Sequence, residues 1–336
     1  MQLGVVGLGY WGPNLVRNAL ENPRYEDVWV WDRDPQRVQL IRRQYRAVRV
    51  ASDFDEMLRN DAINAIAVAT PVSTHFELGC SVLNAGKALL MEKPFTATVR
   101  EARALRDLAE KKNGKLLIDH TFIYTSAVQK IKELRRKGDL GEIYYYDSVR
   151  VNLGLFQHDA NVISDLAPHD LAIMDYLLEQ SPTSISAVGV AHIDRRFENI
   201  AYLHLDFDNG LVAHFHLNWL SPVKIRQTLI GGSKKMLVYD DMEASDKIKV
   251  YDKGVQITRK DDVYKTLIQY RSGDLCVPQI RNVEALKVMM EHFADCVEKD
   301  AAPITDAASG IRVMQMLEAA QKSLKLGGKK IPLTYE

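Results

Sequence analysis

The chain has 336 residues, 46% hydrophobic and 26% charged, and its 44 basic side chains equal its 44 acidic ones. This length exceeds what one hydrophobic core usually organises, so we expect two domains. The balanced charge provides no general attraction for nucleic acid or for an anionic membrane, and neither is expected as a partner. The apolar stretches are also shorter than the roughly 18–20 residues that a membrane-spanning helix needs.

The first residues and the cysteines indicate the cellular compartment. Residues 1–7 lack the basic leader and the small-residue cleavage site of a signal peptide. Cys80, Cys276 and Cys296 are widely separated and form no metal-ligand spacing, so we expect reduced thiols and no metal site. These features predict a cytoplasmic protein.

Residues 1–120 alternate short apolar runs with helical patterns. The runs that we expect to form buried strands are 2–7, 27–31, 65–69, 88–92 and 115–119. The periodic stretches that we expect to form helices are 13–21, 35–44, 75–85 and 99–112. Strand–helix alternation is typical of a parallel sheet covered on both faces by helices. We therefore predict an α/β Rossmann domain over residues 1–120.

In residues 121–336 the alternation of strands and helices gives way to consecutive strand-like runs. After a helix at 126–137, strand-like runs follow at 143–153, 183–192, 200–206, 211–219, 224–231, 235–239 and 248–251. Asp208-Asn209-Gly210 is a hairpin turn signal, and helical patterns close the chain at 283–299 and 306–326. The pattern predicts an α+β domain with a large, mostly antiparallel open sheet. Apolar outward residues in 211–219 would provide a homodimer or homotetramer surface.

A glycine-rich turn follows the first predicted strand. Gly7, Gly9 and Gly12 form the spacing GxGxxG, with a strand before it and a helix after it. Gly7 permits a tight turn, Gly9 lets the backbone approach a pyrophosphate, and Gly12 allows close packing of helix on strand. The helix that begins near Pro13 directs free N–H groups and its positive dipole end at the phosphates. We predict a dinucleotide site here, with Tyr10 and Trp11 among its contacts.

The acidic residue that this motif requires is Asp32, 20 positions beyond Gly12 at the end of an apolar run. Its carboxylate should accept hydrogen bonds from the adenosine ribose and repel the 2′-phosphate of NADP. NAD is therefore the expected cofactor. NADP stays open because the guanidinium of Arg33 could bind that phosphate instead.

Three further motifs carry a resemblance to a known family. They are Thr70-Pro71-Val72-Ser73-Thr74-His75, Met91-Glu92-Lys93-Pro94 and Asp165-Leu166-Ala167-Pro168-His169-Asp170. Joined to the glycine motif, they resemble the Gfo/Idh/MocA family of glucose–fructose oxidoreductases and inositol dehydrogenases over essentially the whole chain. The last motif departs from the usual form, because it lacks paired glycines before Asp165 and carries Pro168.

The Glu92-Lys93 pair suits the oxidation of a secondary alcohol. That reaction needs a cation that stabilises the developing alkoxide and a group that accepts the hydroxyl proton. Lys93 lies at the carboxyl end of a predicted strand, where open α/β sheets bind ligands. Glu92 is expected to hold the nicotinamide ribose and to keep Lys93 charged. The resemblance implies that Thr70, Pro71 and His75 line the cofactor.

Asp165 and His169 are four residues apart, so on one helix they share a face. Pro168 fits best in a first turn, so we expect the helix to begin no earlier than about Asp165, with that residue near the N-cap. Simple capping by Asp165 and a buried core role for His169 remain alternatives. The resemblance implies that His169 accepts the proton and that Asp165 contacts substrate or orients the base.

Other polar residues are candidates for binding. His120 follows the last Rossmann strand and is expected near the nicotinamide. Residues 150–157 lead towards Asp165, and Asn152 and Gln157 offer donors and acceptors suited to sugar hydroxyls. We count both as candidate substrate contacts.

Two pairs of basic side chains have a structural interpretation beside a functional one. His214 and His216 alternate with apolar residues, and a structural or interface role is favoured over metal binding. Lys224 and Arg226 lie near Trp219 and could hold a diphosphate, although a solvated strand edge is the preferred interpretation.

Together these residues predict an NAD-dependent dehydrogenase acting on a sugar-type secondary alcohol. The motif variants look similar to family members associated with surface-polysaccharide sugars, so a UDP-N-acetylhexosamine or its uronate, oxidised at the 3-position, is the specific expectation. A free sugar or inositol dehydrogenase is the alternative within the class. A non-catalytic NAD sensor and an enzyme that recycles a tightly held cofactor with a 2-oxo acid also stay open.

Overall fold

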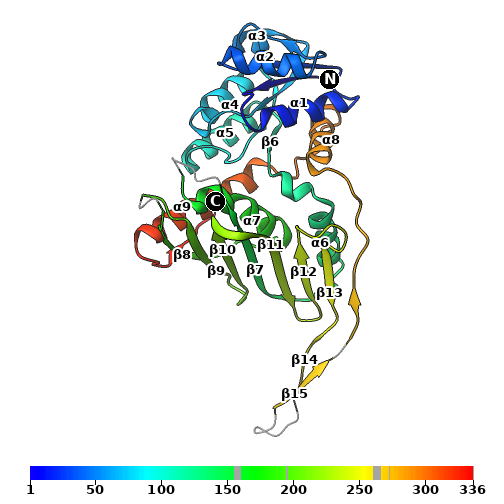
Figure 1. The fold of residues 1–336 in the computed structure, drawn as a ribbon, viewed down its shortest axis with the longest axis vertical. Helices are drawn as coiled ribbons and strands as arrows, with labels where there is room; N and C mark the ends of the chain where they lie inside the picture. The colour runs from blue at the N-terminus through cyan, green and yellow to red at the C-terminus, as the bar shows by residue number, and fades with distance from the viewer. Residues whose placement is uncertain (155–159, 194–195, 260–265, 272, 336) are drawn as a thin grey trace. The chain divides into compact units, whose positions relative to one another are not determined.

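The computed structural model describes residues 1–154, 160–193, 196–259, 266–271 and 273–335 (Figure 1). The chain forms two compact units. Unit 1 contains Met1–Thr125 and Val283–Gln315, and unit 2 contains Ser126–Asn282 and Met316–Glu336. The chain passes from unit 1 to unit 2 after Thr125 and returns to unit 1 at Val283. Among the described residues, no helix is both long and apolar enough to cross a membrane.

Unit 1 is built on a six-stranded sheet in which every neighbouring pair is parallel. Its strands are β1 (Gln2–Val6), β2 (Asp27–Trp31), β3 (Arg49–Val50), β4 (Ile63–Val68), β5 (Ala88–Met91) and β6 (Leu116–Ile118), in the order β3-β2-β1-β4-β5-β6. The predicted parallel sheet is confirmed. The order reverses between β1 and β4, and sheets of this kind bind ligands at the carboxyl ends of the strands beside such a reversal.

Helices cover this sheet. They are α1 (Gly12–Glu21), α2 (Pro35–Gln44), α3 (Phe54–Arg59), α4 (His75–Asn84), α5 (Val99–Lys111) and α8 (Ala285–Glu298), with short 3₁₀ turns η1 (Val72–Thr74) and η2 (Thr121–Tyr124). Helix α1 packs against α8, and α4 packs against α5 (Figure 1). Unit 1 therefore includes a helix from near the other end of the chain.

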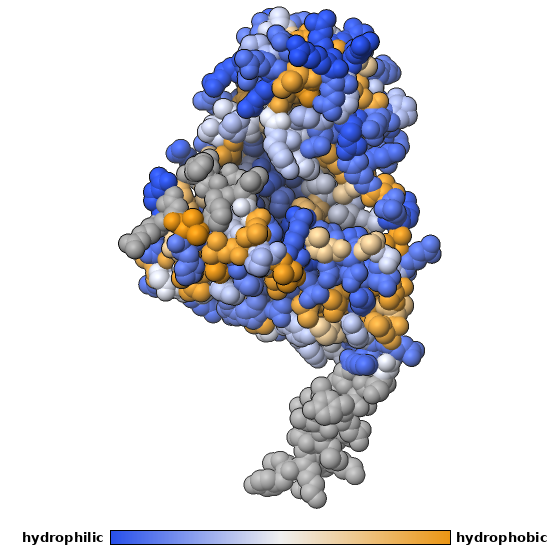
Figure 2. Space-filling model, in the orientation of Figure 1, coloured by the Kyte–Doolittle hydropathy of each residue, from blue (hydrophilic) through white to orange (hydrophobic). Residues whose placement is uncertain are grey.

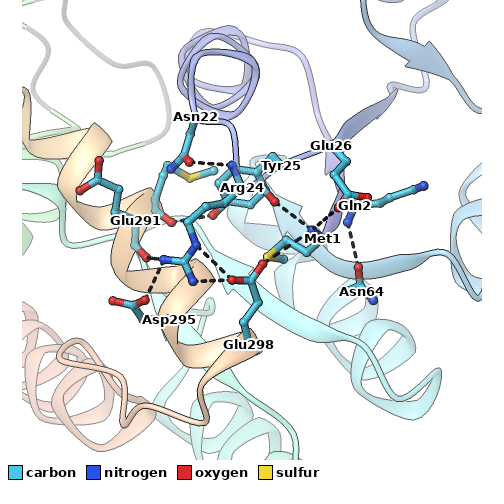
Figure 3. A network of polar contacts seen from close by, with 11 residues as sticks. Met1, Gln2, Asn22, Arg24, Tyr25, Glu26, Asn64, Glu291, Asp295 and Glu298 are labelled. Carbon is cyan, nitrogen blue, oxygen red and sulfur yellow. Dashed lines mark hydrogen bonds and ion pairs between the residues drawn. The ribbon is translucent and has the colours of Figure 1, made fainter.

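Helix α8 is tied to unit 1 by a network of polar contacts around Arg24, in the loop between α1 and β2 (Figure 3). The Arg24 guanidinium binds Asp295 at 2.7 Å and Glu298 at 2.5 Å. The Met1 ammonium lies 3.6 Å from Glu298, and Tyr25 Oη donates to the Met290 carbonyl at 2.6 Å. Directed ion pairs and a buried hydrogen bond thus fix the helix on this unit.

Unit 2 is built on a nine-stranded sheet in the order β16-β13-β12-β11-β7-β10-β9-β8-β17. Its strands are β7 (Ile143–Leu153), β8 (Ser184–Val190), β9 (Ile200–Asp206), β10 (Val212–Asn218), β11 (Leu220–Gly232), β12 (Met236–Asp240), β13 (Ile248–Tyr251), β16 (Leu275–Cys276) and β17 (Ile331–Pro332). Strands β14 (Gly254–Arg259) and β15 (Thr266–Arg271) form a separate hairpin. Within the large sheet β7 and β10 pair in parallel and the other pairs are antiparallel, as predicted.

Three further helices are α6 (Ser126–Arg136), α7 (Val162–Leu178) and α9 (Ala307–Lys325), the last of which begins in unit 1 and ends in unit 2. Helix α7 packs on β7, β9 and β10, and α6 packs on α7. The apolar layer of unit 2 therefore lies between α7 and the inner face of the sheet. The turn at Gly210, which has a φ of 82°, joins β9 to β10 as predicted.

The predicted start of α7 was wrong. The helix begins at Val162, and the Asn161 side chain caps it by accepting a hydrogen bond from Ser164 N at 3.1 Å. Pro168 consequently lies inside the helix, where it cannot donate a backbone N–H. Val162 and Ile163 are both 0% exposed, and their burial extends the helix upstream of the position that the proline alone suggested.

The expected apolar outer surface of 211–219 was also wrong. In β10 the apolar side chains of Ala213, Phe215 and Leu217 are buried, whereas His214 is exposed and His216 half-buried. Side chains alternate between the faces of a strand, so the histidines occupy the outer face. Buried apolar residues face α7 instead.

Exposed apolar side chains do occur on neighbouring strands of the same outer face. Val188 of β8 pairs with Tyr202 of β9, which pairs with His216 of β10, so the three form one row. Val188 is 51% exposed and Tyr202 50%. Figure 2 shows hydrophobic side chains interrupting the polar surface of unit 2.

Candidate active site

The glycine loop between β1 and α1 has no room for side chains at two of its glycines. Gly7 has a φ of +92°, and a Cβ there would lie 2.6 Å from the Ala69 carbonyl oxygen. A Cβ on Gly12 would lie 2.0 Å from the Gly7 oxygen. The backbone at the start of α1 is therefore packed directly on the sheet, which leaves the free N–H groups of the helix accessible to phosphates. The loop fits a dinucleotide.

Asp32 follows the last residue of β2, and two backbone N–H groups hold its carboxylate in place. Its Oδ2 accepts a hydrogen bond from Leu8 N at 2.6 Å, and its Oδ1 accepts one from Asp34 N at 2.8 Å. Arg37 lies 3.9 Å from Asp32 Oδ2, and the side chains of both Arg37 and Arg33 are exposed. The carboxylate therefore points at the glycine loop, and an arginine that the sequence analysis did not select lies beside it.

A pocket of about 540 Å³ opens between the glycine loop and α2. Its lining residues are Leu8, Gly9, Pro13, Arg37, Leu40, Ile41, Arg43 and Gln44. Tyr10, at the tip of the loop, is 90% exposed. The loop thus offers both a pocket and an accessible aromatic ring to a ligand.

His75 joins two loops at the carboxyl ends of the strands. Its Nε2 lies 2.9 Å from the Thr70 carbonyl oxygen, and its Nδ1 lies 3.0 Å from that of Pro94. Burial lowers the pKa of this imidazole. Thr70 is further held by a 2.7 Å hydrogen bond between its hydroxyl and that of Thr74, while Pro71 is exposed. His75 is thus placed to orient the loops on which Thr70 and Lys93 lie.

Four side chains follow the carboxyl ends of β5 and β6. Glu92 is 9% exposed, Asp119 2% and His120 3%, whereas Lys93 is half-buried. Lys93 N donates to Glu92 Oε2 at 3.0 Å. Burial, followed by the proximity of Asp119, raises the pKa of Glu92 well above its ordinary value. A raised pKa favours the neutral form of this carboxyl, which weakens Glu92 as a counter-ion for the Lys93 ammonium.

His120 should make the stability of the protein fall in mild acid. Burial lowers its pKa from 6.5 to about 4, so below pH 6.5 the unfolded chain takes up a proton that the folded one refuses. Stability attributable to neutral His120 is complete above pH 6.5 and is lost as the pH falls towards 4. The loss amounts to about 3 kcal/mol. Urea unfolding across this range should show the slope in the wild type and not in His120→Asn.

Glu92→Gln is the matched control, because its effect has the opposite sign. The folded chain keeps the Glu92 proton above pH 4.5, where the unfolded chain releases it, so the wild type loses stability relative to this variant as the pH rises. Equal pH slopes for the wild type and both variants would contradict these assignments.

Asp165 and His169 lie on one face of α7, as predicted, and both are half-buried. Because Asn161 caps the helix, Asp165 is not the N-cap. Its Oδ2 accepts a hydrogen bond from Trp219 Nε1 at 3.1 Å. A Cβ on Gly154 would lie 2.5 Å from the Trp219 ring, so the strand end packs closely against this indole. Trp219 therefore orients the carboxylate.

The remaining predicted contacts have different surroundings. Asn152 is half-buried near the end of β7, and Gln157 lies outside the described residues. Lys224 is exposed, whereas Arg226 forms an ion pair with Asp241 at 3.4 Å. Since the charge of Arg226 is already compensated, the structure favours the preferred interpretation of this segment as a strand edge over a diphosphate site.

A row of hydrogen bonds crosses the outer face of the large sheet. Asp147 Oδ1 lies 3.0 Å from His214 Nδ1, His214 Nε2 lies 2.9 Å from His204 Nδ1, and His204 Nε2 lies 3.1 Å from Asp206 Oδ1. The histidines are thus paired with carboxylates and with each other on the sheet surface. No group of residues with metal-ligand geometry occurs among the described positions.

The family of the chain follows from comparison with known proteins. Residues 1–120 match the model of the Gfo/Idh/MocA oxidoreductase family, NAD-binding Rossmann fold, and residues 128–238 match the model of its C-terminal domain. The chain belongs to this family, and the resemblance found in the motifs is confirmed. The predicted class of NAD-binding oxidoreductase acting on CH–OH groups is confirmed with it.

Relatives of the chain match it along nearly its whole length. The uncharacterized oxidoreductase YdgJ of Escherichia coli is 30% identical over 97% of this chain and 96% of its own. The UDP-N-acetylglucosamine 3-dehydrogenase of Acidithiobacillus ferrooxidans is 26% identical over 94% of each chain. The scyllo-inositol 2-dehydrogenase (NAD(+)) of Bacillus subtilis is 24% identical over 97% of this chain and 93% of its own.

The solved structure of the Acidithiobacillus enzyme has the same fold. It superposes with a TM-score of 0.81 at 24% identity, covering 97% of this chain and 98% of that one. This likeness extends over both units and concerns the fold alone.

The structure adds Asp119, Trp219 and Arg37 to the residues of the candidate site. The sequence predicts Asp119 only as the end of a strand and Trp219 only as an aromatic beside two cations. An acidic residue at the end of a buried parallel strand, like Asp32 after β2, was the available signal for Asp119. The partnership of Trp219 with Asp165 spans 54 positions and had no such signal.

Proposed function

We propose that this protein oxidises a secondary alcohol of a nucleotide sugar to a ketone with NAD. The best candidate substrate is a UDP-N-acetylhexosamine or its uronate, oxidised at the 3-position. The relatedness to UDP-N-acetylglucosamine 3-dehydrogenase along the full chain supports this choice. The observation that carries the proposal is Lys93, which follows buried Glu92 just beyond the carboxyl end of β5, in the same unit as the glycine loop.

The proposed reaction divides the work among three side chains. Bound NAD supplies the hydride acceptor. Lys93 binds the alcohol oxygen and stabilises the negative charge that develops there as the C–H bond breaks. His169 accepts the hydroxyl proton on its imidazole, and Asp165, held by Trp219, binds a substrate hydroxyl or orients His169.

The proposed cofactor is NAD rather than NADP. Asp32 directs a carboxylate at the glycine loop, where it would accept hydrogen bonds from the ribose hydroxyls and would repel a 2′-phosphate. Glu92 and His120 are proposed to contact the nicotinamide side of the cofactor. The Glu92 Oε1 atom is buried without a hydrogen-bond partner, which supports a ligand or a retained proton at that position.

A second candidate is an inositol or free-sugar dehydrogenase. The scyllo-inositol 2-dehydrogenase relative is similar at nearly the same identity as the nucleotide-sugar enzyme. Arg226, engaged by Asp241, provides no free guanidinium for a diphosphate. These two observations support inositols and free sugars as the second candidate class of substrate.

The substrate is tested by following NADH formation with purified protein and a matched panel. We expect turnover of UDP-N-acetylglucosamine or its uronate, and a value of kcat/KM at least about tenfold higher than with free N-acetylglucosamine, glucose, scyllo-inositol or myo-inositol. A 2-oxo acid is added in parallel to detect a recycled cofactor. Turnover confined to the inositols would replace the nucleotide-sugar proposal, and no reduction of NAD by any member would refute both.

We also propose that copies of the chain associate through the outer face of the large sheet, as a homodimer or homotetramer. Half-exposed Val188 and Tyr202, together with the row of carboxylates and histidines, give this face both apolar and polar contacts. Sedimentation equilibrium measures the mass of the assembly directly.

The three free cysteines support a reducing compartment such as the cytoplasm.

A further inference from the structure

Asp119 receives hydrogen bonds from two different segments of unit 1. Its Oδ2 accepts one from Trp11 Nε1 at 2.8 Å. Its Oδ1 accepts two from Thr121, one from the backbone N–H at 3.0 Å and one from the hydroxyl. Asp119 N in turn donates to the Met91 carbonyl at 2.7 Å. This carboxylate is therefore held rigidly at the ends of β5 and β6.

Trp11 brings the glycine loop into this arrangement. It occupies the position immediately before Gly12, at the N-cap of α1, so its backbone belongs to the segment that faces the phosphates. Its indole N–H donates to Asp119, which lies 108 positions later in the chain, just beyond the carboxyl end of β6. A charge-assisted hydrogen bond is short and directional, so it restricts the loop to one conformation.

Asp119 also faces the reaction centre. Its carboxylate and the Lys93 ammonium both act electrostatically on Glu92 and on His120. Burial and the neighbouring Asp119 raise the pKa of Glu92, because a second negative charge is unfavourable in this buried site.

We propose that Asp119 is a positioning residue that couples the glycine loop to Lys93, through Trp11 on one side and Glu92 on the other. The inference rests on the proposed function for the role of Lys93. Free protein already has the loop ordered for the pyrophosphate, so NAD binding costs less ordering. Movement of the glycine loop in turn displaces Asp119, and with it the charge that acts on Glu92 beside Lys93.

The test is a double-mutant cycle on NAD affinity, measured by calorimetry without substrate. Trp11→Phe keeps an aromatic side chain but removes the indole N–H donor. Asp119→Asn removes the negative charge of the acceptor. We expect each to weaken NAD binding about tenfold, the scale of one charge-assisted hydrogen bond, and the double variant to be no weaker than either. Trp11→Phe should also lower kcat at saturating NAD, which a loss of affinity alone would not do.

Trp29→Phe is the matched control. The Trp29 indole donates to Gln2 Oε1 at 3.0 Å in the same unit, away from the glycine loop, so its loss should leave NAD affinity unchanged. If Trp11→Phe behaves like this control, or if the two effects in the cycle simply add, the coupling does not exist. Trp11→Phe decides the matter alone should Asp119→Asn fail to fold.

This result is separable from the substrate test. Non-additive NAD binding together with no turnover of any sugar would sustain the coupling and refute the proposed function. Turnover of a nucleotide sugar with an additive cycle would do the reverse.

Discussion

The Lys93→Met variant is expected to have a kcat about 10³-fold below that of the wild type, equivalent to about 4 kcal/mol of lost transition-state stabilisation. Methionine has nearly the length of lysine but no charge, so the alkoxide would develop beside an apolar side chain. Binding of NAD should change by less than about threefold, because the cation acts on the reacting oxygen. Steady-state kinetics and calorimetry on one preparation measure both quantities.

Lys115→Met is the control for this substitution. Lys115 precedes β6, at the opposite end of the sheet from Lys93, and forms an ion pair with exposed Asp300. Such surface pairs contribute at most about 1 kcal/mol to stability, and kcat should stay at the wild-type level. A kcat for Lys93→Met within about tenfold of wild type would remove the lysine from the chemistry.

Gly12→Ala is expected to destabilise unit 1 by about 3 kcal/mol and to abolish measurable NAD binding. The added methyl carbon would lie 2.0 Å from the Gly7 carbonyl oxygen and 3.0 Å from its carbon. These neighbours are backbone atoms, so α1 must move off the sheet to relieve the overlap. The N–H groups that face the pyrophosphate move with it. Thermal unfolding and NAD calorimetry read the two effects.

Gly9→Ala separates the fold from the ligand. Among the described residues other than its chain neighbours, the atom that its added methyl would approach is the Arg37 guanidinium nitrogen at 3.2 Å, at the end of a flexible side chain. Stability should therefore stay near that of the wild type, while the methyl obstructs a pyrophosphate. Wild-type NAD affinity in both glycine variants would refute the assignment of the loop.

The parts of the fold that the sequence predicted are those with strong local periodicity. Parallel strands buried on both faces and amphipathic helices with clear ends, such as α2 with its capping Asp34, leave an unambiguous pattern. Strand β3 has two residues, both exposed, and α3 has six. Elements this short lack the repeats that a pattern requires.

Long-range contacts account for what the sequence did not predict. The attachment of α8 to unit 1 depends on pairs such as Arg24 with Asp295, 271 positions apart. The predicted start of α7 was wrong because it rested on Pro168 alone. The burial of Val162 and Ile163, which extends the helix upstream, exists only in the folded protein. For the site, the sequence predicts motif residues whose roles stay proposals, while the partners Asp119, Arg37 and Trp219 depended on tertiary structure.

Strand β6, at one edge of the parallel sheet, pairs with a segment around Thr305 that the ribosome synthesises much later. Ile118 N on β6 donates to the Thr305 carbonyl at 2.8 Å, and Thr305 Oγ1 donates back to the Ile118 carbonyl at 2.6 Å, across 187 positions. While the ribosome translates unit 2, this edge strand has no such partner and is open to pairing with other chains. This edge of unit 1 can therefore be completed only after residue 305 has been translated.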